Sequence, residues 1–121
     1  MARTICIDDV QADRKLVAVM LRKMGHSVVV CDDREGWKRL FADHEQYDLV
    51  VLDMIMPIPG DAFIKEMIRQ GVKAKVIGLS GGMEGRFEAL LNAEKHLASA
   101  ILTKPVDRQA FVQAVTTLMS A

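Results

Sequence analysis

Acidic, hydroxyl and ammonium side chains follow four of the short apolar runs in this sequence. The carboxylates are Asp8, Asp9 and Asp53, the hydroxyl is Ser80 and the ammonium is Lys104. Carboxylates held close together repel one another unless a cation lies among them, and a site made of oxygen atoms suits Mg²⁺. A carboxylate is also a competent nucleophile, while lysine and serine can stabilise phosphoryl oxygens during transfer. These residue types indicate magnesium-dependent phosphoryl transfer if the fold brings them together.

Five short apolar runs, which alternate with helical patterns, must position these residues. The runs cover residues 4–7, 28–31, 49–52, 75–79 and 100–102. After each run, apolar residues recur at helical spacing, and representative positions are Leu16, Trp37, Phe63, Phe87 and Phe111. Such alternation predicts a parallel sheet with helices on both faces, whose ligand site lies beyond the carboxyl ends of the strands. Those are the ends that carry the acidic, hydroxyl and ammonium side chains.

The composition restricts the class of protein. A length of 121 residues predicts one domain over 1–121, and 50% hydrophobic residues suffice for a cooperative core. Sixteen Lys plus Arg balance sixteen Asp plus Glu, so no basic excess favours direct binding to nucleic acid. Cys6 and Cys31 are too few for a disulfide framework, and no run approaches the ~18 apolar residues of a membrane span. We expect a soluble, cytoplasmic protein without membrane insertion.

Four dispersed motifs occur in a recognisable order, namely ICIDD, VVLDMIMP, GLSGG and ILTKP. Together they resemble the receiver domain of bacterial two-component response regulators, of the single-domain, chemotaxis-regulator-like kind. The resemblance covers nearly the whole chain. It implies a flavodoxin-like, doubly wound α/β fold, with a five-stranded parallel sheet in the order 2-1-3-4-5 and five helices.

The resemblance also implies a role for each acidic residue. Asp53 would be the phosphoacceptor, and Asp9 would bind Mg²⁺ directly. Asp8 would act nearby, partly through a metal-bound water. The backbone carbonyl of Ile55 would be a further metal ligand, so that four groups including Asp53 surround the ion.

The same resemblance implies how the phosphoryl group would be held. Ser80 would bind it, Lys104 would pair with it, and the Gly81 amide would donate to another of its oxygens. Pro105 would follow a cis peptide bond, which an X-Pro sequence permits at low cost. We expect signalling through movement of segment 80–85 and of the helix after it, because the glycines of this segment ease backbone rearrangement.

Some positions depart from the family pattern. Gly60 comes one position early in the loop after the acceptor, and Pro59 stiffens that loop. Ile101 occupies a position where many receivers carry Tyr or Phe, so this chain cannot swing an aromatic ring inward. Ile55 and Gly82 offer no polar side chain to position an attacking water, which predicts slow spontaneous loss of the phosphoryl group.

The resemblance therefore implies a phosphorelay regulator that is not a turnover enzyme, self-dephosphorylation aside. A histidine kinase or histidine phosphotransfer protein would supply the phosphoryl group to Asp53. The protein would then act on an unknown downstream protein through contacts, or serve as a phosphate shuttle. One alternative is a pseudo-receiver that binds proteins independently of phosphorylation, which Ile101 and the shortened loop favour. A flavin-binding electron carrier shares the fold class, but Asp8 and Asp9 would repel a flavin phosphate.

Overall fold

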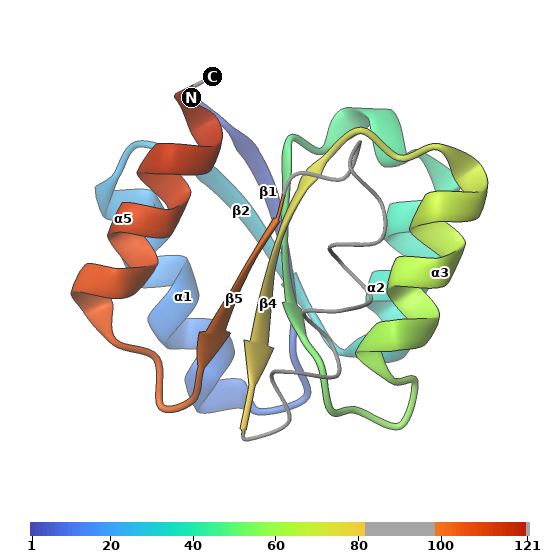
Figure 1. Cartoon of the computed structure of the whole chain (residues 1–121), viewed down its shortest axis with the longest axis horizontal. Coiled ribbons are helices and arrows are strands. Elements are labelled where there is room, and N and C mark those ends of the chain that lie inside the picture. The colour runs from blue at the N-terminus through green and yellow to red at the C-terminus, as the bar shows by residue number, and fades with distance from the viewer. Residues whose placement is uncertain (82–98, 121) are drawn as a thin grey trace.

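A five-stranded parallel sheet forms the centre of the molecule. The computed structural model of the chain describes residues 1–81 and 99–120. The strands lie in the order β2-β1-β3-β4-β5 (Figure 1). Their bounds are Arg3–Ile7 for β1, Ser27–Cys31 for β2, Leu49–Asp53 for β3, Lys75–Ser80 for β4 and Ser99–Thr103 for β5. The predicted doubly wound α/β fold and its strand order are confirmed.

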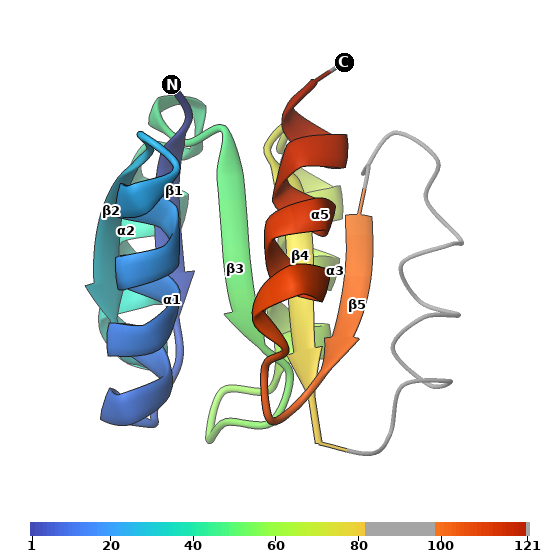
Figure 2. The ribbon, with the colours of Figure 1, turned by 90° about the vertical axis from the view of Figure 1, so that its left-hand side faces the viewer.

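Helices cover both faces of the sheet. The pair α1 and α5 lies on one face, and the pair α2 and α3 lies on the other (Figures 1 and 2). Their bounds are Gln11–Lys23 for α1, Asp33–Ala42 for α2, Gly60–Gln70 for α3 and Arg108–Met119 for α5, with a 3₁₀ turn, η1, at His44–Gln46. Four of the five expected α-helices are thus described. The helix expected around Phe87, and most of segment 80–85, lie outside the described residues.

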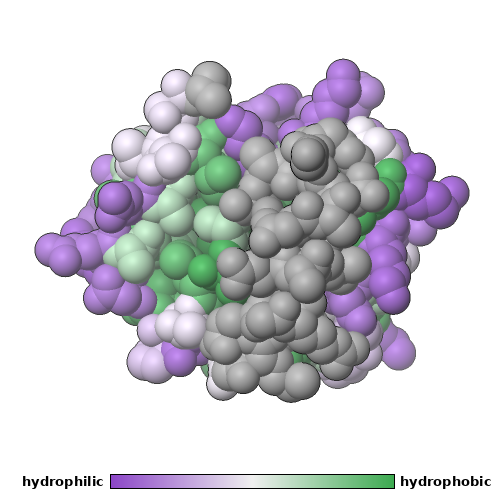
Figure 3. All heavy atoms as spheres, in the orientation of Figure 1, coloured by the Kyte–Doolittle hydropathy of each residue, from purple (hydrophilic) through white to green (hydrophobic). Residues whose placement is uncertain are grey.

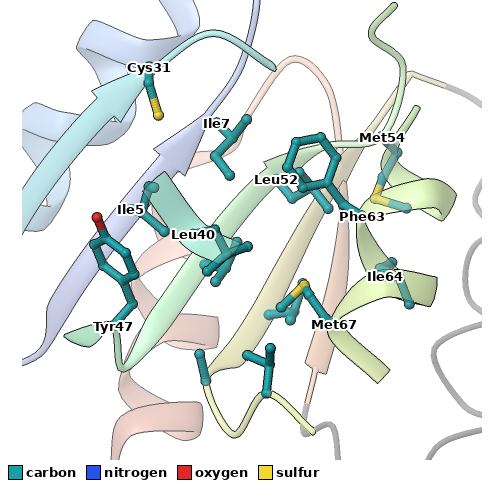
Figure 4. Close-up of a cluster of buried hydrophobic side chains, with 14 of the residues drawn as sticks. Ile5, Ile7, Cys31, Leu40, Tyr47, Leu52, Met54, Phe63, Ile64 and Met67 are labelled. Carbon is teal, nitrogen blue, oxygen red and sulfur yellow. The ribbon is translucent and has the colours of Figure 1, made fainter. Parts of the chain in front are cut away.

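The middle strand, β3, is buried along its whole length because helices cover both of its faces. Successive strand residues point to opposite faces, which divides the core into two clusters. Ile5 and Leu52 belong to the cluster under α2 and α3 (Figure 4), whereas Cys6 and Val51 belong to the cluster under α1 and α5. Cys31 lies in the first cluster and is not disulfide-bonded to Cys6.

Two glycines allow helices to approach the sheet closely. A Cβ atom on Gly36 of α2 would lie 2.6 Å from the Ile7 side chain. A Cβ atom on Gly60 would lie 2.7 Å from the Met54 backbone, and the Gly60 N–H donates to the Met54 carbonyl at 3.0 Å. The early glycine of the shortened loop therefore begins α3 directly against the residue that follows β3.

The surface in the view of Figure 3 combines hydrophilic regions with apolar surface gathered over α5 and β5. Charged side chains pair along the exposed side of α2, where Arg39 Nε lies 2.9 Å from Glu35 Oε1. No helix in residues 1–81 and 99–120 has the length and apolar character needed to span a membrane.

Thr4 provides a test of the core under α1 and α5. Its side chain is 2% exposed, and its hydroxyl has no hydrogen-bond partner within the described part of the chain. An unsatisfied buried hydroxyl costs about 1 to 3 kcal/mol, so Thr4→Val should raise the free energy of unfolding by about 1 kcal/mol. Urea denaturation followed by circular dichroism measures this change.

The matched control is Thr4→Ser, which keeps the hydroxyl and removes the methyl group. It should lower the free energy of unfolding by about 1 kcal/mol, since a buried methyl group is lost. A Thr4→Val protein no more stable than wild type would show that the hydroxyl is satisfied in solution.

Candidate functional site

The carboxyl ends of four strands bring the predicted residues to one edge of the sheet. Asp8 follows β1, Asp53 ends β3, Ser80 ends β4, and Lys104 follows β5. The parallel register aligns Asp53 with Leu79 of β4, and Ser80 with Thr103 of β5. The carboxyl ends of these strands, which carry residues far apart in the sequence, lie at the lower end of the sheet in Figure 1.

The Lys104 ammonium lies at the centre of this group. Its Nζ atom lies 2.8 Å from Asp13 Oδ2, 3.1 Å from Asp8 Oδ2 and 3.4 Å from Asp53 Oδ2. Burial by itself lowers the pKa of Lys104, but hydrogen bonds to Asp13 and Asp8 and the charges of nearby carboxylates outweigh it. The pKa of Lys104 is therefore raised, and the side chain stays charged at all ordinary pH values.

Hydrogen bonds hold both the side chain and the backbone of Asp8 in place. Its side chain is completely buried, and its Oδ1 atom accepts a hydrogen bond from the Val10 N–H at 2.9 Å. Its own N–H donates to the Cys31 carbonyl at 3.1 Å, and its carbonyl accepts from Arg14 Nη1 at 2.6 Å. Asp8 thus holds the start of α1 against the ends of β1 and β2, and it presents Oδ2 to Lys104.

Asp53 is a buried carboxylate with one oxygen turned toward Lys104. It is 5% exposed, and its Oδ1 accepts a hydrogen bond from the Ile55 N–H at 3.1 Å. Burial and the charge of Asp8 raise the pKa of Asp53 to about 6, although the Ile55 N–H and Lys104 act in the opposite direction. Asp53 is therefore largely ionised at neutral pH.

Asp9 lies at the rim of the site. Its side chain is exposed, and Oδ1 accepts a hydrogen bond from the Asp33 N–H at 3.2 Å. Its pKa is raised by partial desolvation and by the charges of Asp33, Asp32 and Asp8. A cavity of about 460 Å³ opens beside Asp9 and is lined in part by Arg14, Asp32 and Asp33. Asp9 is thus the acidic residue of the predicted set that faces solvent.

The remaining predicted residues border the cluster of Lys104 and its carboxylates. Ser80 is fully buried, and its carbonyl accepts the Lys104 N–H at 2.8 Å. Gly81 is exposed at the end of the first described range, and the Ile55 side chain is 56% exposed. The peptide bond between Lys104 and Pro105 is cis.

Ile101 lies on β5 beside Gly78 of β4. A Cβ atom on Gly78 would lie 2.7 Å from Ile101 Cδ1 and 3.1 Å from Met54 Sδ. Ile101 packs against the cluster under α2 and α3. Its side chain therefore fills the space that the glycine leaves.

Two neighbours of the site were not predicted from the sequence. Asp13 forms the shortest ion pair of Lys104. Asp33 is buried and accepts hydrogen bonds from the N–H groups of Ile58 at 2.7 Å and Arg34 at 2.9 Å, which ties α2 to the loop before α3. No local sequence pattern singles out Asp13, because its contact with Lys104 depends on how α1 is rotated relative to β5.

The oxygen donors suit a hard cation. Within residues 1–81 and 99–120, no three His, Cys, Asp or Glu side chains are arranged to hold a metal ion. Mg²⁺, however, needs only one or two carboxylates and retains several waters. Asp8 and Asp53 already share one cationic partner, Lys104, so the donor set fits Mg²⁺ chemically.

Residues 4–116 match the family described as response regulator receiver domain. Among curated proteins, the sensor histidine kinase GacS of Pseudomonas protegens is 29% identical over 124 residues. That alignment covers 93% of this chain but 13% of GacS, so the chain corresponds to a small part of that relative.

Solved structures show the same fold. A response regulator receiver domain protein from Clostridium thermocellum is 25% identical with a TM-score of 0.85, covering 99% of this chain and 95% of that one. The chemotaxis protein CheY4 of Vibrio cholerae, 21% identical, has a TM-score of 0.82 and covers 98% of this chain and 99% of its own. Because the family match spans nearly the whole sequence, the chain belongs to the response regulator receiver domain family.

Proposed function

We propose that Asp53 accepts a phosphoryl group from a phosphohistidine of a partner protein, with Mg²⁺ bound beside it. The position of Lys104 carries this proposal, because its ammonium lies 3.4 Å from Asp53 and 3.1 Å from Asp8. A fixed positive charge beside a buried carboxylate stabilises the negative charge that spreads over phosphoryl oxygens during transfer.

In the transfer step, a carboxylate oxygen of Asp53 attacks phosphorus and forms an acyl phosphate. The bond between phosphorus and the histidine nitrogen breaks, and its electron pair goes to the imidazole. The other ring nitrogen carries a proton, so the imidazole leaves as a neutral ring. A pKa of about 6 keeps Asp53 largely ionised, and therefore nucleophilic, at neutral pH.

Asp9, Asp53 and the backbone carbonyl of Ile55 would hold the metal directly, and Asp8 would act partly through a metal-bound water. When bound, Mg²⁺ offsets the charge of the carboxylates and of the phosphoryl oxygens. The Ser80 hydroxyl and the Gly81 amide are proposed to donate to the same oxygens, since they follow β4 at the edge that Lys104 reaches from β5. The site's role would be that of a phosphoacceptor rather than of a turnover enzyme.

The proposed donor is a histidine kinase or a histidine phosphotransfer protein. The likeness to part of a relative named as a sensor histidine kinase supports a partner of this chemistry. The output would be a contact with a downstream protein, or transfer of the phosphoryl group onward. A module that binds proteins without phosphorylation would have no use for Lys104 among three carboxylates, so phosphotransfer is favoured.

The two ends of β3 provide a matched test of the phosphoacceptor. Incubation with acetyl phosphate and Mg²⁺ should add one phosphoryl group to the wild-type protein, and intact mass spectrometry should detect it. Asp53→Asn should abolish the gain, because the nucleophile is lost. Asp48→Asn removes a carboxylate just before the opposite end of the strand and should leave the gain intact. A gain in Asp53→Asn, or none in wild type, would refute the assignment.

The raised pKa of Asp53 has a consequence for stability without metal. Its folded pKa of about 6 exceeds the ordinary value of 3.8, so the folded state binds this proton more tightly than the unfolded state. The stabilisation of the folded state by protonated Asp53 is present at low pH and is lost as pH rises through about 6.

As pH rises from 5 to 7, the free energy of unfolding of wild type should therefore fall by about 1 kcal/mol relative to that of Asp53→Asn, by the linkage between pKa and stability. Urea denaturation at both pH values in the presence of a chelator measures this difference. Parallel pH profiles for the two proteins would contradict the raised pKa.

The lifetime of the acyl phosphate should depend on Ile55. This exposed side chain has no group to orient an attacking water, so the phosphorylated protein should lose its phosphoryl group slowly. Ile55→Asn should shorten the lifetime about threefold or more, because an amide can orient water beside the site. Ile55→Leu is the apolar control, and intact mass after donor removal follows the decay. Equal lifetimes for the two variants would exclude this role.

A further inference from the structure

The Asp13 carboxylate lies closer to Lys104 than the proposed phosphoacceptor does. Asp13 Oδ2 is 2.8 Å from Lys104 Nζ, whereas Asp53 Oδ2 is 3.4 Å away. Building on the proposed phosphotransfer function, we propose that Asp13 is a positioning residue that holds Lys104 before transfer and releases it to the phosphoryl group afterwards.

The ammonium group has as many charged partners as it has donors. It carries three N–H groups, and its ion pairs in the described structure are with Asp8, Asp13 and Asp53. A phosphoryl group on Asp53 brings three strong acceptor oxygens and added negative charge. Esterification removes the carboxylate charge of Asp53 and puts the new acceptor oxygens beyond it. Lys104 can therefore follow those oxygens only by moving away from Asp13 or Asp8, which accept its hydrogen bonds.

Breaking the ion pair between Lys104 and Asp13 costs less free energy than breaking the pair with Asp8. Its side chain is 30% exposed, so water can hydrate the carboxylate after Lys104 leaves. Asp8 is completely buried, and its release would leave an unpaired charge without solvent. Asp13 also lies in the first turn of α1, where the helix dipole stabilises a free negative charge.

The backbone on both sides of this pair is held in place, so the exchange is a movement of side chains. The Lys104 N–H donates to the Ser80 carbonyl at 2.8 Å, which fixes the lysine backbone beside β4. Arg14, the neighbour of Asp13, donates to the Asp8 carbonyl at 2.6 Å and fixes the start of α1. Asp13 therefore competes with the phosphoryl group for one ammonium, and it should lower the phosphorylated fraction.

The test compares phosphorylation of wild type and Asp13→Asn at limiting acetyl phosphate with Mg²⁺, by intact mass. Asparagine keeps the shape of the side chain and removes its charge. The ratio of phosphorylated to unphosphorylated protein should rise about two- to fivefold, as expected for the loss of a partly exposed ion pair. Asp13→Glu, which restores a carboxylate, should return the ratio to the wild-type value.

Asp48→Asn is the matched control for charge alone. Asp48 precedes β3, at the end of the strand opposite Asp53, and its ion pair is with Arg3 at 3.3 Å. The ratio of phosphorylated to unphosphorylated protein in this variant should stay within about 1.5-fold of wild type, because exposed charges are screened by salt.

Thermal unfolding establishes that each variant is folded, and Asp13→Ser replaces Asp13→Asn if the latter does not fold. A phosphorylated-to-unphosphorylated ratio in Asp13→Asn equal to that in Asp48→Asn would overturn the exchange while leaving phosphotransfer to Asp53 intact. An Asp13→Glu protein that behaves like Asp13→Asn would overturn it as well. A wild-type protein that takes up no phosphoryl group would overturn the proposed function, and the exchange with it.

Discussion

The site depends on one interaction, which is the ion pairing of the Lys104 ammonium with carboxylates that solvent scarcely reaches. Asp8 is fully buried and Asp53 is 5% exposed, so neither charge can rely on water for its stabilisation. Asp53 ends β3, Asp8 follows β1 and Lys104 follows β5, and the parallel order β2-β1-β3-β4-β5 brings these ends to one edge. The ammonium therefore links the stability of the sheet edge to the phosphoryl chemistry that we propose for it.

Desolvation has opposite effects on stability and on function at this edge. Burial raises the pKa of Asp53 to about 6, which makes ionisation unfavourable for the folded protein without metal. The same burial makes the carboxylate a better nucleophile and strengthens its attraction to a cation. The site holds more carboxylates than cations, so a bound cation would offset its negative charge and, together with Lys104, the charge that the proposed phosphoryl group adds.

Much of the fold was predictable because each apolar run is short, bounded by polar residues and followed by a helical pattern. The juxtaposition of Asp8, Asp53 and Lys104 followed from the rule that parallel strands end at one edge. The role of Asp13 was not predictable, because it depends on the rotation of α1 about its axis relative to β5. Ile101 was identified from the sequence as a missing aromatic, yet its packing over Gly78 depends on a cross-strand pair that no local pattern reveals.

The most direct measurement of the central interaction is the ¹⁵Nζ resonance of Lys104 in the isotopically labelled protein, with and without a beryllofluoride adduct as a phosphoryl mimic. We expect the resonance to shift when the adduct forms in wild type, because the ammonium exchanges a carboxylate for the phosphoryl-like group. Asp53→Asn, which cannot form the adduct, should show no shift. A Lys104 resonance that is unchanged while other signals report adduct formation would contradict the central role of this ammonium.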